Sequence, residues 1–150
     1  MSARTRFVQL ALSKIGSTVL WGANGPDVFD CSGLVLWALG AAGVNLSDRR
    51  AQDLHDESPN LATAPGEALP VPGDLVFYGL NPQRVTHVAI WLDGGRVVSA
   101  DGATSRVTDL RAARANPGAR VRLHEVPQYR RDFLSIHRNT FADAKDLICL

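Results

Sequence analysis

The sequence has little cysteine, no long hydrophobic run and almost no net charge. Cys31 and Cys149 are its two cysteines among 150 residues, too few for a disulfide framework and without the Cys/His spacing of a zinc site. No stretch approaches the roughly 18–20 apolar residues of a membrane span. A net charge of +1 gives no general attraction for nucleic acid or membranes. We therefore expect neither partner, and neither a metal nor another cofactor.

The charge is nevertheless uneven along the chain. Residues 111–138 contain seven Arg against Glu125 and Asp132, a local net charge of +5. Such a region can bind an anionic polymer, or it can be an ordinary solvated face. The second interpretation is the more common one for a soluble domain.

The N-terminus begins basic, but Gln9 and Lys14 interrupt the apolar run that follows, and no small-residue cleavage site is present. We interpret residues 3–15 as an amphipathic helix and not as a secretory signal. Its buried stripe should consist of Val8, Ala11, Leu12 and Ile15. If the protein acts outside the cytoplasm, we expect another machine to deliver it.

The rest of the pattern places helices first and strands after them. Helices are predicted over residues 31–42, from 48 or 49 to 55, and over 110–116, and strands over 75–78, 87–92, 96–100, near 106–109, and over 119–124. The first of these helices is apolar nearly all round and should be central. Residues 56–73, with four prolines, predict a long irregular connection. The tail from Gln128 is expected to be a polar extension with a possible last helix. This order predicts an α+β fold, with helices packed on one face of an antiparallel sheet.

Cys31 stands where a loop becomes the central helix. A helix N-terminus favours a thiolate, and the free N–H groups of the first turn can stabilise an oxyanion. Asp30 can cap the helix, and Gly33 keeps the first turn slim enough for a substrate to approach. The alternative is that Cys31 is an unreactive buried thiol.

His87 is the best candidate for a base among the four histidines. It precedes the apolar residues 88–92, so its ring should be held firmly at the end of a central strand that faces the Cys31 helix. The other histidines, His55, His124 and His137, have polar neighbours and are expected at the surface. The alternative for His87 is a structural histidine. Ser99, Asp101 and Asp93 are the polar candidates for a third residue that orients the imidazole.

Four segments together resemble the NlpC family of papain-like cell-wall peptidases. Residues 29–35 resemble the nucleophile motif of the family, and Trp21-Gly22 resembles the tryptophan-glycine pair that precedes that motif. Residues 72–77 resemble the segment before the histidine strand, and residues 87–92 resemble the histidine strand itself. The resemblance runs from about residue 5 to about 110, and weakly to 126. It implies a papain-like domain over residues 1–126, followed by an extension of unknown role over 127–150.

The resemblance also implies an activity and a set of site residues. The family uses a Cys–His mechanism without a cofactor to cut peptidoglycan stem peptides, often between D-glutamate and a diamino acid. By this analogy Cys31 is the nucleophile and His87 the base. Asp30, Ser32 and Trp21 become candidates for substrate binding.

Two positions depart from the family pattern. The family usually has a His or another strong acceptor twelve residues after the base, where this chain has Ser99. Asp101 lies two residues further and shares the strand face of Ser99 if the strand continues. We expect Ser99 or a water to orient His87, with Asp101 as the alternative. Val19 replaces a Tyr that in many members helps to form the substrate subsite.

Three functions remain open from the sequence. The first is a peptidoglycan endopeptidase, encoded by a phage or delivered by a secretion machine. The second is a related Cys–His amidase that cuts the sugar–peptide amide or a cross-bridge. The third is a degenerate phage structural or binding module, an option that Ser99 keeps open. The sequence does not fix the oligomeric state, and a monomer is the simplest expectation.

Overall fold

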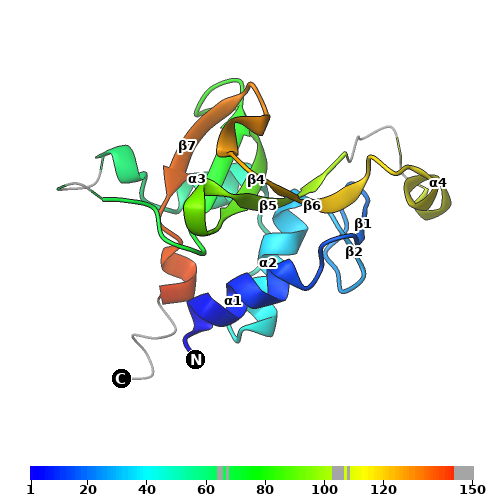
Figure 1. Cartoon of the computed structure of the whole chain (residues 1–150), viewed down its shortest axis with the longest axis horizontal. Helices are drawn as coiled ribbons and strands as arrows, with labels where there is room; N and C mark the ends of the chain where they lie inside the picture. Colours follow the sequence, from blue (N-terminus) through cyan, green and yellow to red (C-terminus); the bar gives the residue numbers. More distant parts are fainter. Residues whose placement is uncertain (64–65, 67, 103–106, 108, 144–150) are drawn as a thin grey trace.

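A computed structural model describes residues 1–63, 66, 68–102, 107 and 109–143. They form helices packed against one mixed, seven-stranded sheet with strand order β2-β1-β6-β5-β4-β3-β7 (Figure 1). The helices are α1 (Ala3–Leu12), α2 (Cys31–Ala41), α3 (Ala51–Asp56) and α4 (Leu110–Ala115), and the short 3-10 turns are η1 (Leu61–Thr63), η2 (Asp93–Gly95) and η3 (Pro127–Tyr129). The strands are β1 (Thr18–Val19), β2 (Val28–Phe29), β3 (Leu75–Gly79), β4 (Val85–Trp91), β5 (Val97–Asp101), β6 (Arg120–His124) and β7 (Phe133–His137). The strand pairs are antiparallel except for β1 with β2. The predicted α+β class is therefore confirmed.

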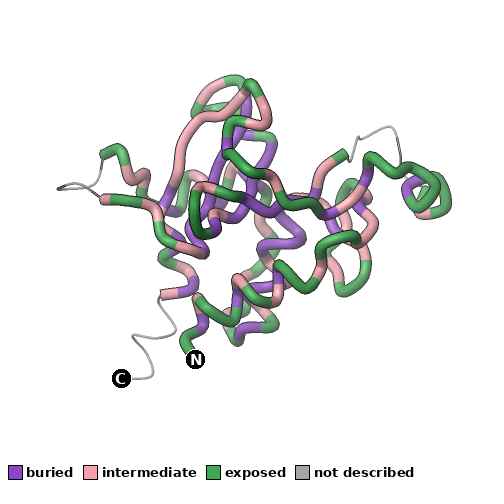
Figure 2. The backbone as a smooth tube through the Cα atoms, viewed as in Figure 1, coloured by how far each residue is buried: buried purple, intermediate pink, exposed green. Residues whose placement is uncertain are grey.

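Buried residues run through the sheet and α2 (Figure 2), and the buried apolar residues form two separate clusters. On one face α2 packs into the main core, which includes Val88 and Ile90 of β4. On the other face lies a smaller cluster, to which β4 contributes Ala89. Because side chains alternate along a strand, His87 shares the face of Ala89. The base candidate thus lies on the sheet face opposite to the α2 core.

Most predicted elements are present within a few residues of their predicted bounds. The exception among the helices is α1, which ends at Leu12. Its buried side chains are Ala3, Phe7 and Ala11, while Leu12 and Ile15 are 37% and 46% exposed. The predicted stripe is wrong beyond Ala11, because the chain leaves the helix and binds β6 through the N–H of Gly16, which donates to the carbonyl of Val121.

The strands differ from the prediction in four places. The short strands β1 and β2 lie in a part of the chain for which no strand was predicted. β4 begins at Val85, so His87 is its third residue and not its first. The strand predicted near 106–109 falls mostly outside the described residues, and the two described positions there, Val107 and Asp109, are in no strand. The tail contains β7, which was not predicted and which pairs with β3 along its length. Pairing with a neighbouring strand, and not a local pattern, makes this segment a strand.

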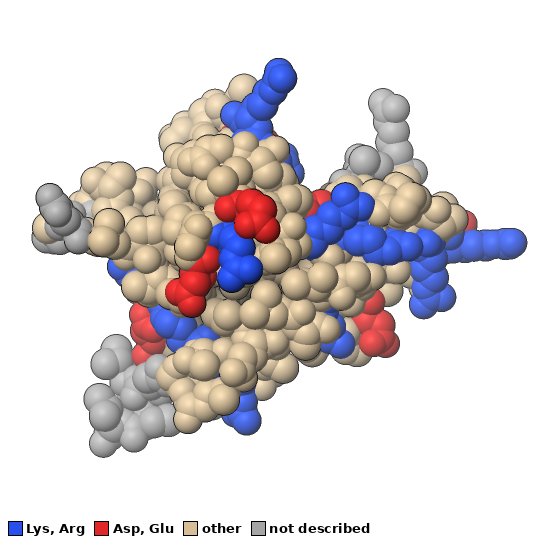
Figure 3. All heavy atoms as spheres, viewed as in Figure 1, with Lys and Arg blue, Asp and Glu red and all other residues tan. Residues whose placement is uncertain are grey.

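Lys and Arg side chains gather over the end of the molecule that carries β6 and α4 (Figure 3), and four arginines of residues 111–138 belong to these two elements: Arg111, Arg114, Arg120 and Arg122. Arg120 uses its guanidinium to hold these two elements together. It donates to the backbone carbonyls of Ala113, Arg114, Asn116 and Ala119. At least this part of the basic region therefore has a structural role.

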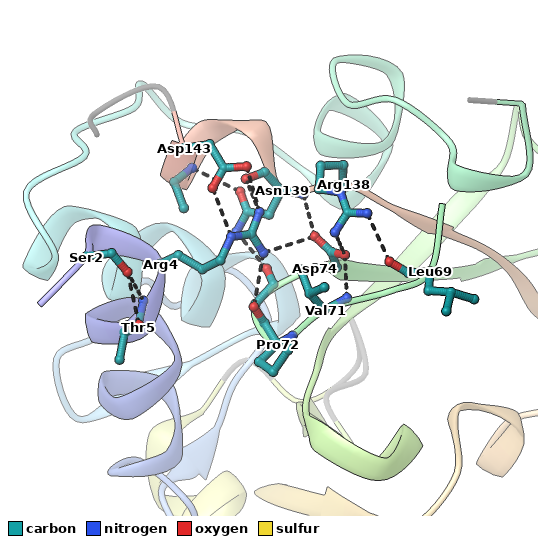
Figure 4. A network of polar contacts seen from close by, with 12 residues as sticks. Ser2, Arg4, Thr5, Leu69, Val71, Pro72, Asp74, Arg138, Asn139 and Asp143 are labelled. Carbon is teal, nitrogen blue, oxygen red and sulfur yellow. Dashed lines mark hydrogen bonds and ion pairs between the residues drawn. The ribbon is translucent and has the colours of Figure 1, made fainter. Parts of the chain in front are cut away.

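Asp74 is a fully buried carboxylate at the start of β3 (Figure 4). Its two oxygens accept bonds from Arg4 at 3.0 Å and Arg138 at 2.7 Å. Two backbone N–H groups, those of Val71 and Asn139, complete its partners at 2.9 and 3.0 Å. A buried charge needs such complete pairing to be tolerated.

Arg4 extends this network to both ends of the described chain. Its guanidinium also binds the carboxylate of Asp143 and the carbonyls of Pro72 and Asn139. The network therefore joins α1, the loop before β3, and the segment that follows β7.

We expect Asp74→Asn to lower the free energy of unfolding by about 3–5 kcal/mol, because it leaves two arginines without their shared anion in a buried site. Urea denaturation followed by circular dichroism measures this change. The matched control is Asp27→Asn at an exposed position, for which a change within about 0.5 kcal/mol is expected. A loss below about 1 kcal/mol for Asp74→Asn would show that the network is not needed for stability.

Candidate active site

The thiol of Cys31 lies at the first residue of α2, as the sequence predicted. Asp30 is the N-cap, and its carboxylate accepts a bond from the Gly33 N–H at 2.6 Å. The other oxygen of Asp30 accepts from the Gly22 N–H at 2.9 Å. The same carboxylate thus starts the helix and fixes the loop that precedes it. Cys31 is half-buried, and its Sγ lies 3.9 Å from the carbonyl oxygen of Thr86 in β4.

Gly33 is required for a different reason from the predicted one. A Cβ at this position would lie 2.0 Å from the carbonyl oxygen of Ala23 and 2.8 Å from the Asp30 carboxylate. The glycine therefore allows the loop before α2 to pack directly on the first turn. Its role is close packing, and not access for a substrate.

His87 is 5% exposed and lies between the thiol and a set of polar side chains. Its Nε2 is 2.9 Å from the hydroxyl of Tyr129 and 3.4 Å from Oδ1 of Asp101. The Cys31 thiol is close enough to raise the pKa of His87, and Nδ1 is the ring nitrogen that the hydrogen bond to Tyr129 leaves available to it.

The surroundings of His87 favour its charged form. Burial alone would lower the pKa of His87, but the interactions with Asp101 and Cys31 outweigh burial and raise that pKa above its ordinary value. An imidazolium beside a thiol at a helix N-terminus favours the thiolate. The arrangement can therefore supply a nucleophile and, next to it, a proton donor.

Asp101 is the centre of the polar set behind His87. Ser99 and the Tyr129 hydroxyl donate to Oδ1 at 2.7 and 2.8 Å, and Nε2 of His124 lies 2.5 Å from Oδ2. Burial would raise the pKa of Asp101, but its interactions with His87, His124 and Ser99 lower it to about 2. Asp101 is thus a fixed anion at neutral pH.

The structure brings most of the predicted residues together. Ser99 and Asp101 share one face of β5, as expected. The hydroxyl of Ser99 bonds to Asp101 and Tyr129, and among the described contacts none joins it to His87. Asp93 lies in η2, at the opposite end of the β4–β5 hairpin. It is therefore not a partner of the imidazole.

Sequence reasoning missed Tyr129 and His124. Tyr129 lies in the tail that was interpreted as a polar extension. His124 was expected at the surface with His55 and His137, and this was wrong. His124 contacts Asp101, while His137 is 2% exposed and bonds to Ser58. The alternation along residues 120–124 did place His124 opposite Val121 on the strand. Its contact with Asp101 is a tertiary one, because the strand register pairs His124 with Val97 and the imidazole reaches along the sheet to the carboxylate.

The three candidates for substrate binding border one cleft. The cleft has a volume of about 690 Å³ and opens beside Cys31 and His87. Trp21, 62% exposed, stands at its edge together with Asp30 and Ser32. The lining also includes Asp48, Arg49, Arg50 and Arg130. The cleft thus offers both charge signs to a ligand.

The described residues contain neither a cluster of His, Cys, Asp or Glu able to hold a metal nor a helix long and apolar enough to cross a membrane.

Solved structures share this fold. NlpC2 from Trichomonas vaginalis is 26% identical with a TM-score of 0.67, and the match covers 91% of this chain and 47% of that one. The peptidoglycan hydrolase RipB from Mycobacterium tuberculosis is 27% identical with a TM-score of 0.64, over 91% and 64% of the two chains. RipD from the same species, described as a non-catalytic peptidoglycan-binding NlpC/p60 protein, is 20% identical with a TM-score of 0.65, over 93% and 98%. At that identity RipD supports the fold alone.

Curated relatives agree with the structures. The bifunctional muramidase/DL-endopeptidase CwlT of Bacillus subtilis is 34% identical over 68% of this chain and 30% of its own length. A probable endopeptidase of Mycobacterium tuberculosis is 36% identical over 71% and 26%. The chain therefore spans about a third or less of these relatives. The family model of NlpC/P60 matches residues 16–126, which include the helix of Cys31, the strand of His87 and Asp101, and on this match the chain belongs to the NlpC/P60 family.

Proposed function

We propose that this chain is a cysteine endopeptidase that hydrolyses amide bonds in the stem peptides of peptidoglycan, with Cys31 as nucleophile and His87 as general acid and base. The observation that carries the proposal is the pairing of a thiol at a helix start with a buried imidazole of raised pKa. A nucleophile and an oriented base within reach of each other are what acyl transfer requires.

The reaction follows from this pair. The Cys31 thiolate attacks the scissile carbonyl, and the resulting oxyanion lies near the backbone N–H groups of Cys31 and Ser32 at the start of α2. Protonated His87 gives its proton to the leaving amine as the C–N bond breaks, which leaves a thioester on Cys31. Neutral His87 then takes a proton from water, whose oxygen attacks the thioester and frees the acid and the thiol.

The finer proposal concerns the bond that is cut, which we infer to be the one between D-glutamate and the diamino acid. Arg49, Arg50 and Arg130 line the cleft and suit the carboxylates that both residues carry. Asp30 and Ser32 lie beside the nucleophile, where the ammonium of a short stem peptide would place its charge. A relative named as a DL-endopeptidase supports the same choice.

Delivery of the protein to the wall by a phage or a secretion machine stays a prediction from the sequence, as does its oligomeric state.

Purified diaminopimelate-type peptidoglycan should release stem-peptide fragments when incubated with the wild type under reducing conditions, and none with Cys31→Ala. Mass spectrometry of the soluble products identifies the bond. The matched control is Cys149→Ser, which changes the other thiol and should release the same products as the wild type.

Other products would change the assignment. Whole stem peptides freed from the sugar would indicate the amidase instead. If neither the wild type nor Cys149→Ser releases products from several wall types, the protein is a binding module without turnover.

The lowered pKa of Asp101 makes stability depend on pH in the acid range. Its folded pKa of about 2 lies below the ordinary value of 3.8 for an aspartate, so ionised Asp101 stabilises the fold above about pH 4, and this contribution is lost as pH falls toward 2. The shift corresponds to about 2 kcal/mol, of which about half is lost by pH 3.

We expect the difference in unfolding free energy between the wild type and Asp101→Asn to shrink by about 1 kcal/mol from pH 6 to pH 3, measured by urea denaturation. Asp27→Asn, at an exposed position, should show a much smaller change. A difference that is constant over this range would mean that the carboxylate gains nothing from its partners in the folded state.

A further inference from the structure

Tyr129 lies just beyond residues 16–126, the part of the chain that matches the family model, and its hydroxyl is the group nearest to Nε2 of His87. We propose that Tyr129 is the residue that orients the His87 imidazole and that Asp101 acts on His87 through the Tyr129 hydroxyl. This inference rests on the proposed Cys–His function and adds a positioning residue to it.

The positions of the hydroxyl protons determine the direction of each hydrogen bond among Ser99, Tyr129, Asp101 and His87. Ser99 and Tyr129 each have one hydroxyl proton, and both hydroxyls lie within 2.8 Å of Oδ1 of Asp101. An ionised carboxylate can only accept, so both protons point to Asp101. Toward His87 the Tyr129 oxygen can then only accept. His87 therefore carries a proton on Nε2, and Nδ1 is the nitrogen that can exchange a proton with the Cys31 thiol.

The distances favour Tyr129 over Asp101 as the direct partner. The Nε2 to Tyr129 oxygen distance of 2.9 Å is the normal length of an N–H···O bond, while 3.4 Å to Asp101 is beyond it. Asp101 still stabilises a charged imidazole through space, but its firm hydrogen bond is to the phenol. The chain of donors thus runs from His87 to Tyr129 to Asp101.

The Tyr129 ring is held in place by its neighbours. It stacks on the imidazole of His124, with ring centroids 3.6 Å apart and an angle of 3° between the planes. The ring of Tyr78 meets its edge at 5.5 Å, and the Tyr78 hydroxyl donates to the carbonyl of Pro127 at 2.7 Å, in the same turn. Burial and the Asp101 carboxylate raise the pKa of Tyr129, so its hydroxyl remains a donor at neutral pH.

The same geometry explains why a serine is acceptable at position 99. Its Oγ lies 2.9 Å from the Tyr129 hydroxyl, so a larger side chain on this face of β5 would occupy the space of the phenol. The short side chain leaves room for Tyr129, which supplies the acceptor that Ser99 itself does not offer to His87.

A double-mutant cycle with Tyr129→Phe and Asp101→Asn tests the inference. The first change keeps the ring and removes only the hydroxyl. One readout is kcat and KM for release of stem-peptide fragments. The other is the pH dependence of iodoacetamide alkylation, read by mass spectrometry on the Cys31 peptide so that Cys149 does not contribute. The second readout needs no turnover.

We expect Tyr129→Phe to lower kcat about tenfold or more with KM within about twofold, since it removes a bond to a charged group. The acidic limb of the alkylation profile should move up by about one pH unit, because the imidazolium that supports the thiolate loses its acceptor. Asp101→Asn should lower kcat in the wild-type background, but by less than about threefold in the Tyr129→Phe background, because the two residues act in series.

Ser135→Ala is the matched control. It removes a half-buried hydroxyl on β7, which bonds to His137 and lies outside the network around Asp101. Its kcat, KM and alkylation profile should stay within about twofold of the wild type.

The outcomes separate this inference from the proposed function. The positioning role of Tyr129 would be refuted if Tyr129→Phe had the kcat and the alkylation profile of the wild type. It would also be refuted if Asp101→Asn lowered kcat as much in the Tyr129→Phe background as in the wild type, because Asp101 would then act on His87 directly. A wild type that releases no fragments but whose alkylation profile shifts in Tyr129→Phe would refute the proposed function and support the positioning role. If the wild type releases no fragments, and its Cys31 is alkylated only in the pH range in which an ordinary thiol ionises, both the proposed function and the positioning role are refuted.

Discussion

The pairing of Asp74 with two arginines holds together the parts of the chain on which the site depends. This carboxylate has no access to solvent, so its charge is tolerated only because Arg4, Arg138 and two backbone N–H groups surround it. Those partners come from α1, from the loop before β3 and from the segment after β7. The network therefore anchors the tail against β3 and keeps η3, which precedes β7, beside His87.

A second constraint is the close approach of α2 and β4. The N-cap Asp30 fixes where the helix begins, and Gly33 lets the preceding loop pack on the first turn. As a result Cys31 lies at the end of the helix that faces β4, within sulfur contact of the Thr86 carbonyl. The adjacent residue, His87, is then close to the thiol without any long or flexible connection. Rigid placement of this kind is what a general base requires.

The second face of the sheet is apolar at one end and polar at the other. Ala89 and Val97 belong to its apolar cluster, while His87 and Asp101 lie toward the cleft. β5 lies between β4 and β6 in the sheet, so polar side chains that are distant in the sequence meet on this face. His124 is opposite Val97 in the strand register and reaches Asp101 with its side chain. The Cys31 sulfur thus lies between the start of α2 and the imidazole of His87, whose charge Asp101 stabilises.

Local sequence patterns were sufficient to predict most helices and strands and the positions of Cys31 and His87. The loop-to-helix change at Cys31 and the apolar strand after His87 are visible in the sequence, because they depend on capping, propensity and alternation within a few residues. The bounds were less well determined where pairing partners decide them: β4 starts two residues earlier than predicted, and β7 was not predicted at all. The buried stripe of α1 failed beyond Ala11 because the chain turns away toward β6.

By itself, the sequence determined the fold class, the position of the thiol at a helix start, and the placement of the histidine in a central strand, since each follows from the residues nearby. Only the tertiary structure decided which side chains contact His87 and the Asp101 carboxylate. Tyr129 is separated from His87 by 42 positions and His124 from Asp101 by 23, and no local periodicity records such contacts. They arise from the pairing of β5 with β6, which puts His124 opposite Val97 with its side chain able to reach along the sheet to Asp101, and from the pairing of β7 with β3, which brings a turn of the tail back over the site.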